Sequence, residues 1–318
     1  MIARRLALLL CLYGLFSVAF LTVNARGNWD FVLWFRGTKL LGISLVAVAI
    51  AVATVLFQTL THNRILTPSL MGFDALYALL QTVLVFTLGG FGFSQLSAQT
   101  SFFSSFTIMM VASLLLFGSL LGKSVDGRRE DIHRLLLTGI IFGVLFRSFS
   151  SFLQRLIDPN DFVVAATSAM ASFNSINADL LLVSSLMIAA ALVATWRMRF
   201  DLDVMALGRD AAVNLGVHYK RQVYAMLVII AALVSVSTAL VGPVAFFGLL
   251  VSNLTYQLLP THRHAILLPA ASLLSACVLI GGQVVLEQVL NLSTPLSVIV
   301  EFLGGLTFLI LILKGRNR

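Results

Sequence analysis

The feature that most constrains this chain is a succession of apolar runs, each close to the length of a membrane-spanning helix, separated by polar stretches. A run of about 20 apolar residues crosses the hydrocarbon core of a bilayer as an α-helix, whereas the strands of a membrane barrel alternate in polarity. Charged residues make up 11% of the chain, against about 25% in an average soluble domain. The sequence therefore predicts an all-α integral membrane protein.

Ten spans are expected, forming a single transmembrane domain over residues 1–318. The apolar stretch 163–173 is too short to cross, so we expect a re-entrant or interfacial helix between spans five and six. Arg4 and Arg5 precede the first run as in a signal peptide, but no clear cleavage site follows, which favours a retained first helix. The expected spans are 6–21, 40–60, 71–88, 103–121, 135–153, 180–196, 223–241, 245–259, 267–286 and 296–313.

The distribution of positive charge predicts the topology. Of the 21 Lys and Arg residues, 16 fall at the two termini and in alternate loops, which include residues 197–222. Because cytoplasmic loops carry an excess of Lys and Arg, both termini and this long loop are predicted to be cytoplasmic. Topology thus accounts for the net charge of +8 without nucleic-acid binding. Cys11 and Cys277 lie in apolar segments, so we expect neither a disulfide nor a metal site.

The longest polar interruption is the loop 197–222, which exceeds what a connection between two membrane helices needs. Asp203 can cap a turn that begins at Val204, and Asp210 can cap a helix that Gly216 then stops. Two short capped helices predict a surface that an aqueous partner holds. A solvated, charge-rich loop is the alternative.

No nucleotide-binding or catalytic motif is recognisable in the sequence. Residues 118–124 (GSLLGKS) resemble a phosphate-binding loop, but three residues separate the glycines where the motif needs four, and a membrane helix precedes them instead of a strand. We interpret this stretch as a helix end with an anchoring Lys123. Any use of ATP then requires partner subunits. Paired carboxylates in the middle of a span are also absent from the sequence, which disfavours a secondary carrier without excluding it.

Arg147 lies well inside the fifth expected span. A charge at this depth costs free energy unless it faces a cavity or a partner. With serines beside it, Arg147 is predicted to line a translocation path for an anionic solute. The alternative is an arginine that snorkels to the membrane interface near Arg155. The expected path residues are Arg147, Ser148, Ser150, Ser151 and Asn174.

A break in the apolar pattern separates the seventh and eighth expected spans. Glycine tolerates unusual dihedral angles and proline has no N–H, so the chain can turn sharply here at membrane depth. A hinge or gate and a plain tight turn are both compatible with these residues. The residues concerned are Gly242, Pro243, Phe246 and Gly248.

Three motifs resemble those of iron–siderophore and vitamin B12 importer permeases. They are Q-x4-N-x4-P-x3-G at 58–72, L-G-R-D-A-A-x-x-L-G-V at 207–217 and G-P-x-x-F-x-G-L at 242–249. With the ten-span plan, the resemblance covers essentially the whole chain. It implies a type II ABC importer in a bacterial inner membrane, with two permeases (identical or sister chains), two ATPase subunits and a periplasmic or lipoprotein solute-binding protein.

The resemblance also implies roles for individual residues. Residues 206–217 would be coupling helices seated in an ATPase cleft, and Arg36 and Lys39 would pair with glutamates of the binding protein. ATP and Mg would bind to the ATPase, the permease would hold no cofactor, and iron would pass only as its siderophore complex. The implied coupling residues are Ala206, Leu207, Gly208, Arg209, Asp210, Ala211, Ala212, Leu215, Gly216 and Val217.

The chain departs from the family pattern at two places. Ser252 and Asn253 replace a Pro-His pair, and Arg64 replaces the proline that follows the asparagine of the first motif. These departures disfavour cobalamin as the cargo. With them the chain resembles the subgroup of permeases that serves catecholate or mixed siderophores of the petrobactin, anguibactin or vibriobactin type. The resulting prediction is a permease subunit, not an enzyme, that moves ferric siderophore inward. A cobalamin or haem importer permease and a secondary carrier are the alternatives.

Overall fold

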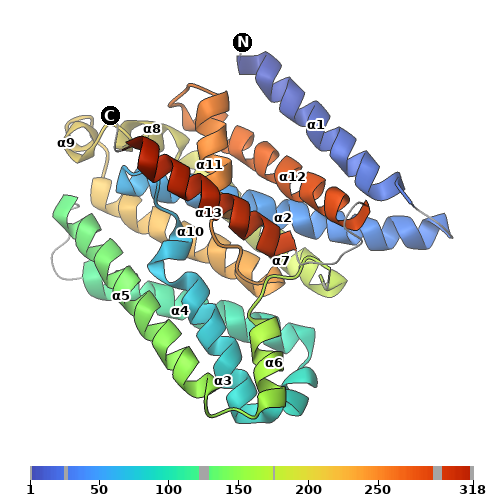
Figure 1. The fold of residues 1–318 in the computed structure, drawn as a ribbon. Coiled ribbons are helices and arrows are strands. Elements are labelled where there is room, and N and C mark those ends of the chain that lie inside the picture. The colour runs from blue at the N-terminus through green and yellow to red at the C-terminus, as the bar shows by residue number, and fades with distance from the viewer. Residues whose placement is uncertain (1, 25–27, 122–128, 175, 289–295, 316–318) are drawn as a thin grey trace.

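The computed structural model describes residues 2–24, 28–121, 129–174, 176–288 and 296–315. Every regular element within these ranges is a helix, which confirms the all-α prediction. Figure 1 shows long, closely packed helices, with α8 and α9 together at one end. Gly122, Lys123 and Ser124 of the phosphate-loop-like stretch lie outside the described residues.

The centre of the bundle is α2 (Trp29–Thr61), which packs against both α10 (Tyr219–Val241) and α12 (His264–Gln288). α1 (Ile2–Thr22) lies along α12 (Figure 1). Small residues of α2, such as Ala47, Ala49 and Ala53, are completely buried. Small side chains let helix backbones approach closely, which is how membrane helices gain packing energy without a hydrophobic effect between them.

The remaining helices surround this centre. α3 packs against α5 and α6, whereas α4 and α7 pack against α10, and α11 contacts both α12 and α13. Their bounds are α3 (Phe73–Ser94), α4 (Ala98–Leu121), α5 (Arg129–Gln154), α6 (Pro159–Ser168), α7 (Ala178–Arg197), α8 (Arg199–Met205), α9 (Arg209–Asn214), α11 (Phe247–Leu258) and α13 (Leu296–Gly315), with a 3-10 turn η1 (Pro68–Met71).

Eight helices of the described chain are long and apolar enough to cross a membrane, namely α1, α2, α3, α4, α5, α7, α10 and α12. The expected count of ten is not confirmed. The expected eighth span is α11, whose 12 residues reach only about 18 Å. The described apolar part of α13 is Leu296–Ile310. α6 stands where a re-entrant helix is expected, and its re-entry into the membrane stays a prediction.

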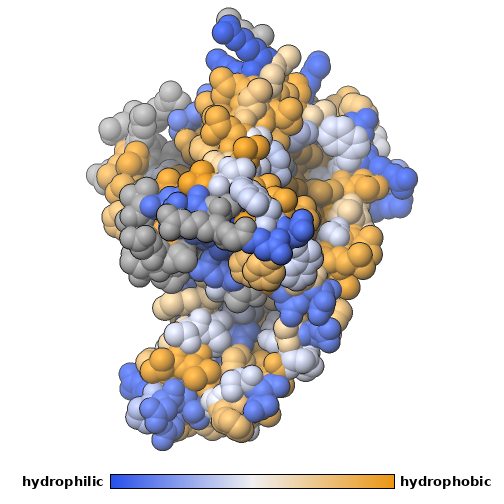
Figure 2. Space-filling view, turned by 90° about the vertical axis from the view of Figure 1, so that its right-hand side faces the viewer, coloured by the Kyte–Doolittle hydropathy of each residue, from blue (hydrophilic) through white to orange (hydrophobic). Residues whose placement is uncertain are grey.

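Large apolar side chains are exposed on the outside of the bundle, for example Leu15 of α1, Leu145 of α5 and Leu186 of α7. Figure 2 shows broad apolar areas on one face, interrupted by hydrophilic patches. Monomeric soluble proteins rarely expose so much contiguous apolar surface. The exposed surface is therefore that of a multi-pass membrane protein.

Residues 158–161 (Asp-Pro-Asn-Asp) are all common in turns, but here they form the start of α6. Asp158 precedes the helix, and its side chain accepts a hydrogen bond from the Asn160 backbone N–H at 3.0 Å. Pro159 occupies the first helical position, where its missing N–H costs nothing. These residues therefore begin a helix.

Two glycines of α5, Gly139 and Gly143, let this helix pack closely against the chain at Met71 and Gly72. A Cβ added to Gly72 (φ 87°) would lie 2.7 Å from the Gly143 Cα, and one added to Gly139 would lie 3.1 Å from the Met71 Cβ. Gly139 and Gly143 form a Gly-x-x-x-Gly pattern, which permits this close packing of α5 against the η1 turn and the Gly72 that follows it.

Candidate functional site

The polar loop contains two short helices, α8 and α9, but they begin earlier than the sequence predicts. α8 starts at Arg199, so Asp203 lies inside it and does not cap a turn at Val204. α9 starts at Arg209 after Gly208, whose φ is 105°, and Asp210 lies in its first turn. The two predicted caps are therefore wrong, because a glycine shapes the entry to α9 and the Asp203 carboxylate bonds elsewhere. Gly216 (φ 84°) follows α9, as expected.

Residues 206–217, which are predicted to couple to an ATPase and are hereafter called the coupling segment, combine a buried anchor with exposed apolar side chains. Ala212 is fully buried, and Val217 packs against the core. Leu207 and Leu215 are 69% and 64% exposed, although both side chains are apolar. Arg209 and Asp210 form a surface ion pair with an N–O distance of 3.5 Å. Exposed leucines on a polar, anchored loop are typical of a surface that a protein partner covers.

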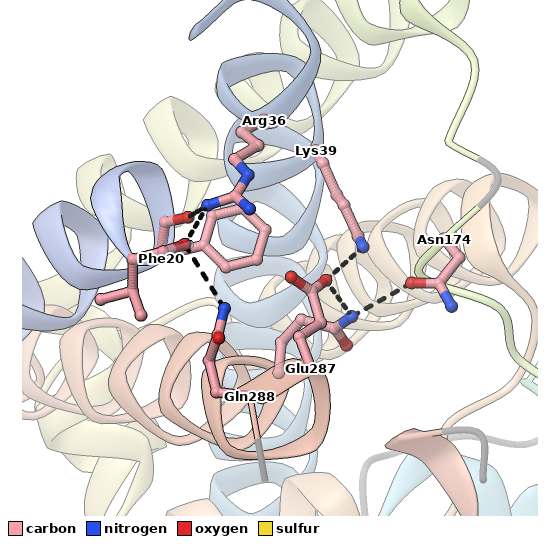
Figure 3. Close-up of polar contacts among 8 residues, drawn as sticks. Phe20, Arg36, Lys39, Asn174, Glu287 and Gln288 are labelled. Carbon is pink, nitrogen blue, oxygen red and sulfur yellow. Dashed lines mark hydrogen bonds and ion pairs between the residues drawn. The ribbon is translucent and has the colours of Figure 1, made fainter. Parts of the chain in front are cut away.

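Arg36, near the start of α2, forms hydrogen bonds within the chain (Figure 3). Its guanidinium donates to the carbonyl oxygens of Phe20 at 2.9 Å and of Val23 at 2.7 Å. The last carbonyls of a helix lack intrahelical partners, so Arg36 satisfies the end of α1. The implied contact with a binding protein stays a prediction, and making it would require Arg36 to leave these carbonyls.

Lys39 is also engaged within the chain. Its ammonium lies 2.5 Å from the Glu287 carboxylate at the end of α12, and the two side chains are only 12% and 14% exposed. Gln283 donates to Glu287 at 2.8 Å and to the Asn174 amide oxygen at 3.1 Å (Figure 3). Asn174, expected on the translocation path, thus joins the Lys39 cluster instead of lying beside Arg147. This cluster ties α2, α12 and the segment before α7 together.

We expect Glu287→Gln to lower the stability of the protein in detergent by about 2 kcal/mol, because it leaves the mostly buried Lys39 ammonium without its counter-charge. The swap Lys39→Glu with Glu287→Lys should recover most of this loss. Thermal unfolding of the purified variants measures both effects. Equal unfolding temperatures for wild type and Glu287→Gln would mean that the pair contributes nothing and that Lys39 is free to bind a partner.

The expected path residues on α5 do not share one face. Arg147, Ser148 and Ser151 are exposed, whereas Ser150 is 5% exposed and bonds to the Thr82 hydroxyl of α3 at 2.9 Å. Ser150 therefore holds α5 against α3, while the other three face outward from the chain. The assignment of the outward residues to a path stays a prediction.

Near the η1 turn lies a half-buried acid, Asp74, whose surroundings sequence spacing does not reveal. Asp74, in the first turn of α3, interacts electrostatically with Arg147 and with Glu301 of α13, and the Ser69 hydroxyl bonds to its carboxylate. Asp74 also borders a cavity of about 20 Å³ at the η1 turn. Charges within a membrane bundle are typically paired or face water, and the pairing or solvation of Arg147 stays open to test.

The second break lies between α10 and α11. Gly242 adopts φ 94°, and a Cβ there would lie 2.8 Å from the Ala171 Cα; one at Gly248 would lie 2.1 Å from the Thr54 hydroxyl oxygen. Phe246 takes the left-handed conformation (φ 56°) at the start of α11. Pro243 falls in the non-helical stretch between the helices. Neighbouring segments thus enclose the break closely, and a gating role stays a prediction.

Sequence reasoning missed His264, a buried side chain near the coupling segment that bonds to two other helices. Its ring contacts Asp203 of α8 and Thr59 of α2, at distances of 2.7 and 2.8 Å. In the sequence His264 is one of several histidines at span boundaries, where solvation is the ordinary expectation. In the structure His264 is 2% exposed, whereas its neighbour His262 is exposed, and the sequence does not reveal this difference.

Comparison with known proteins agrees with this architecture. The model of the FecCD transport family matches residues 7–314. The petrobactin import system permease protein YclO of Bacillus subtilis (strain 168) is 46% identical over 288 residues, which cover 91% of this chain and 90% of YclO. The petrobactin import system permease protein FatC of Bacillus anthracis is 33% identical, covering 88% of this chain and 78% of FatC.

A solved inward-facing structure assigned to the metal-chelate type of ABC transporter has a TM-score of 0.84 with this chain. It covers 99% of this chain and 100% of its own, at 21% identity, and therefore supports the fold alone. The family match confirms the resemblance inferred from the three motifs. This chain belongs to the FecCD transport family.

Proposed function

We propose that this chain is the membrane-spanning permease subunit of an ATP-driven importer that carries a ferric siderophore inward across a bacterial inner membrane. The main structural support for this mechanism is that Ala212 anchors the coupling segment in the bundle while Leu207 and Leu215 of the same segment are exposed. Relatives named as petrobactin import permeases support a siderophore as the cargo. In this role the chain is a transport subunit and not an enzyme.

The partners follow from this role. Two ATPase subunits bind ATP and Mg and hold the coupling segments of two permeases, which are two copies of this chain or this chain and a sister. A periplasmic or lipoprotein binding protein delivers the cargo to the end that carries Arg36 and Lys39. Both termini lie in the cytoplasm, and the permease itself holds no cofactor. Closure of the ATPases moves the coupling segments and shifts the bundle between two states.

The cargo itself distinguishes this proposal from its alternatives. The permease, co-expressed with its ATPase and reconstituted in proteoliposomes, should accumulate ferric petrobactin only when ATP and the binding protein are present. Haem and cobalamin serve as competing cargoes. Preferred uptake of either one would replace the siderophore assignment. Uptake driven by an ion gradient, without any ATPase, would show a secondary carrier.

Arg147→Ala should reduce ferric-siderophore uptake about tenfold without releasing the ATPase, because the outward face of α5 loses its positive charge toward an anionic cargo. Arg155→Ala, which removes an arginine beyond the end of the same helix, is the matched control. Uptake measured in proteoliposomes checks the difference. Normal uptake by Arg147→Ala would instead support an arginine that snorkels to the membrane interface.

A further inference from the structure

A chain of hydrogen bonds runs from α8 into the core of the bundle through one buried side chain. The Asp203 carboxylate oxygen Oδ1 lies 2.6 Å from the backbone nitrogen of His264 and 2.7 Å from its Nδ1. His264 is the first residue of α12 and is 2% exposed. Its Nε2 lies 2.8 Å from the Thr59 hydroxyl near the end of α2. Three helices that are distant in sequence therefore meet at one imidazole.

The protons on this imidazole follow from its neighbours. An ionised carboxylate only accepts, so Nδ1 carries a proton and donates it to Asp203. On the other side, the Thr59 hydroxyl either accepts from a protonated Nε2 or donates to a neutral one, and it also lies 2.9 Å from the Val55 carbonyl oxygen. In both states the ring is bonded on two sides. Hydrogen bonds to a charged group are about twice as strong as neutral ones.

Two further bonds tie α8 to the same core. The His62 ring bonds to the carbonyl oxygen of Met205, the last residue of α8, at 3.0 Å, and Gln222 of α10 donates to Asp201. Hydrogen bonds thus connect α8 to α10, to α12 and to the end of α2, and α8 also packs against α2 and α12. These three helices form the centre of the bundle. A helix of seven residues has little stability of its own, so these contacts determine where it lies.

Open space lies beside the junction. A cavity of about 270 Å³ is lined by residues that include Thr59, His62, Ala206 and His264. Ala206 is the first residue of the coupling segment, so the cavity separates the entry of that segment from the corner between α11 and α12. The coupling segment has room to move here, while the bonds through His264 hold α8 to α2 and α12.

We propose that His264 is a positioning residue that transmits displacement of the coupling segment to α2 and α12 through Asp203 on one side and Thr59 on the other. This inference rests on the proposed function, since it assumes an ATPase that moves the segment. Without the imidazole, the bonds from His62 and Gln222 still hold α8 to the bundle, but Asp203 no longer connects to Thr59 of α2, so less of a displacement of α8 reaches α2. ATP hydrolysis then continues with less movement of cargo.

The decisive variant is His264→Phe, which removes both ring bonds and keeps a buried ring of similar size. The backbone N–H of residue 264 still bonds to Asp203, and the Thr59 hydroxyl still has the Val55 carbonyl, so no buried polar group loses its last partner. Thr59→Val is a second, nearly isosteric variant that removes only the Nε2 bond. His262→Phe is the matched control, because His262 is exposed and borders the same cavity.

The measurement is cargo uptake per ATP hydrolysed, with ATPase recovery and unfolding temperature recorded for each variant in proteoliposomes. We expect His264→Phe to keep its ATPase and hydrolysis rate and to lose about tenfold in uptake per ATP, the effect of one charge-assisted hydrogen bond. Thr59→Val should show a smaller loss, and His262→Phe none.

Each other outcome contradicts the proposal in a distinguishable way. An unchanged ratio of uptake to hydrolysis in both His264→Phe and Thr59→Val overturns the transmission role. Lower stability and ATPase recovery at a constant ratio would reduce His264 to a purely structural residue. A wild-type chain that recovers no ATPase would refute the proposed function itself, and the transmission role with it.

Discussion

Replacing Leu207 and Leu215 together by Ser should release the ATPase from the permease while the permease itself stays folded. Both side chains are mostly exposed, so their loss changes the stability of the isolated chain by no more than about 0.5 kcal/mol. At an interface, each buried leucine contributes about 1–2 kcal/mol, and the double change should weaken ATPase binding about 100-fold. Titration of ATPase onto permease in nanodiscs measures the affinity.

Phe200→Ser is the matched control for this prediction. Phe200 belongs to α8, is 63% exposed and precedes the coupling segment, so the same apolar-to-polar change should leave the affinity within a few-fold of wild type. Tight ATPase binding by the double variant would show that the exposed leucines contact lipid or solvent. The site of coupling would then lie elsewhere in the loop.

Gly242→Ala should destabilise the protein by about 4 kcal/mol and abolish transport. The backbone at Gly242 (φ 94°, ψ 173°) is in a region that essentially only glycine adopts, and this strain costs about 1–3 kcal/mol in other residues. An added Cβ also overlaps the Ala171 backbone at 2.8 Å, and overpacking adds about 1–3 kcal/mol. Thermal unfolding in detergent and ATP-dependent uptake check the two effects.

Gly305→Ala provides the control for the substitution itself. Gly305 lies within α13, and a Cβ there would meet nothing within 4 Å, so alanine should be tolerated or stabilise the helix by up to about 1 kcal/mol. If Gly242→Ala unfolded at the wild-type temperature, the break would be adaptable in the way a hinge requires. A large loss supports a rigid, closely packed turn.

The membrane class, the helical fold and the presence of two short helices in the polar loop 197–222 follow from the sequence alone. Their signals are local, because hydropathy over about 20 residues and a long polar interruption can be seen without knowing any tertiary contact. The three motifs are local in the same sense, and the family match confirms what they indicated. Leu207 and Leu215 could be named because they belong to the second of these motifs.

Tertiary structure decided which polar groups meet. Lys39 and Glu287 are 248 positions apart, and Asp203 and His264 are 61 apart, so no spacing rule connects them. The same limit explains the wrong cap at Asp203 and the inward orientation of Ser150, which differs from that of Ser148 and Ser151. A carboxylate that could cap its own turn bonds to a neighbouring helix, and one serine of a polar cluster turns inward because helix rotation depends on packing. The sequence determined the elements of this protein, whereas the contacts between them exist only once the helices have packed together.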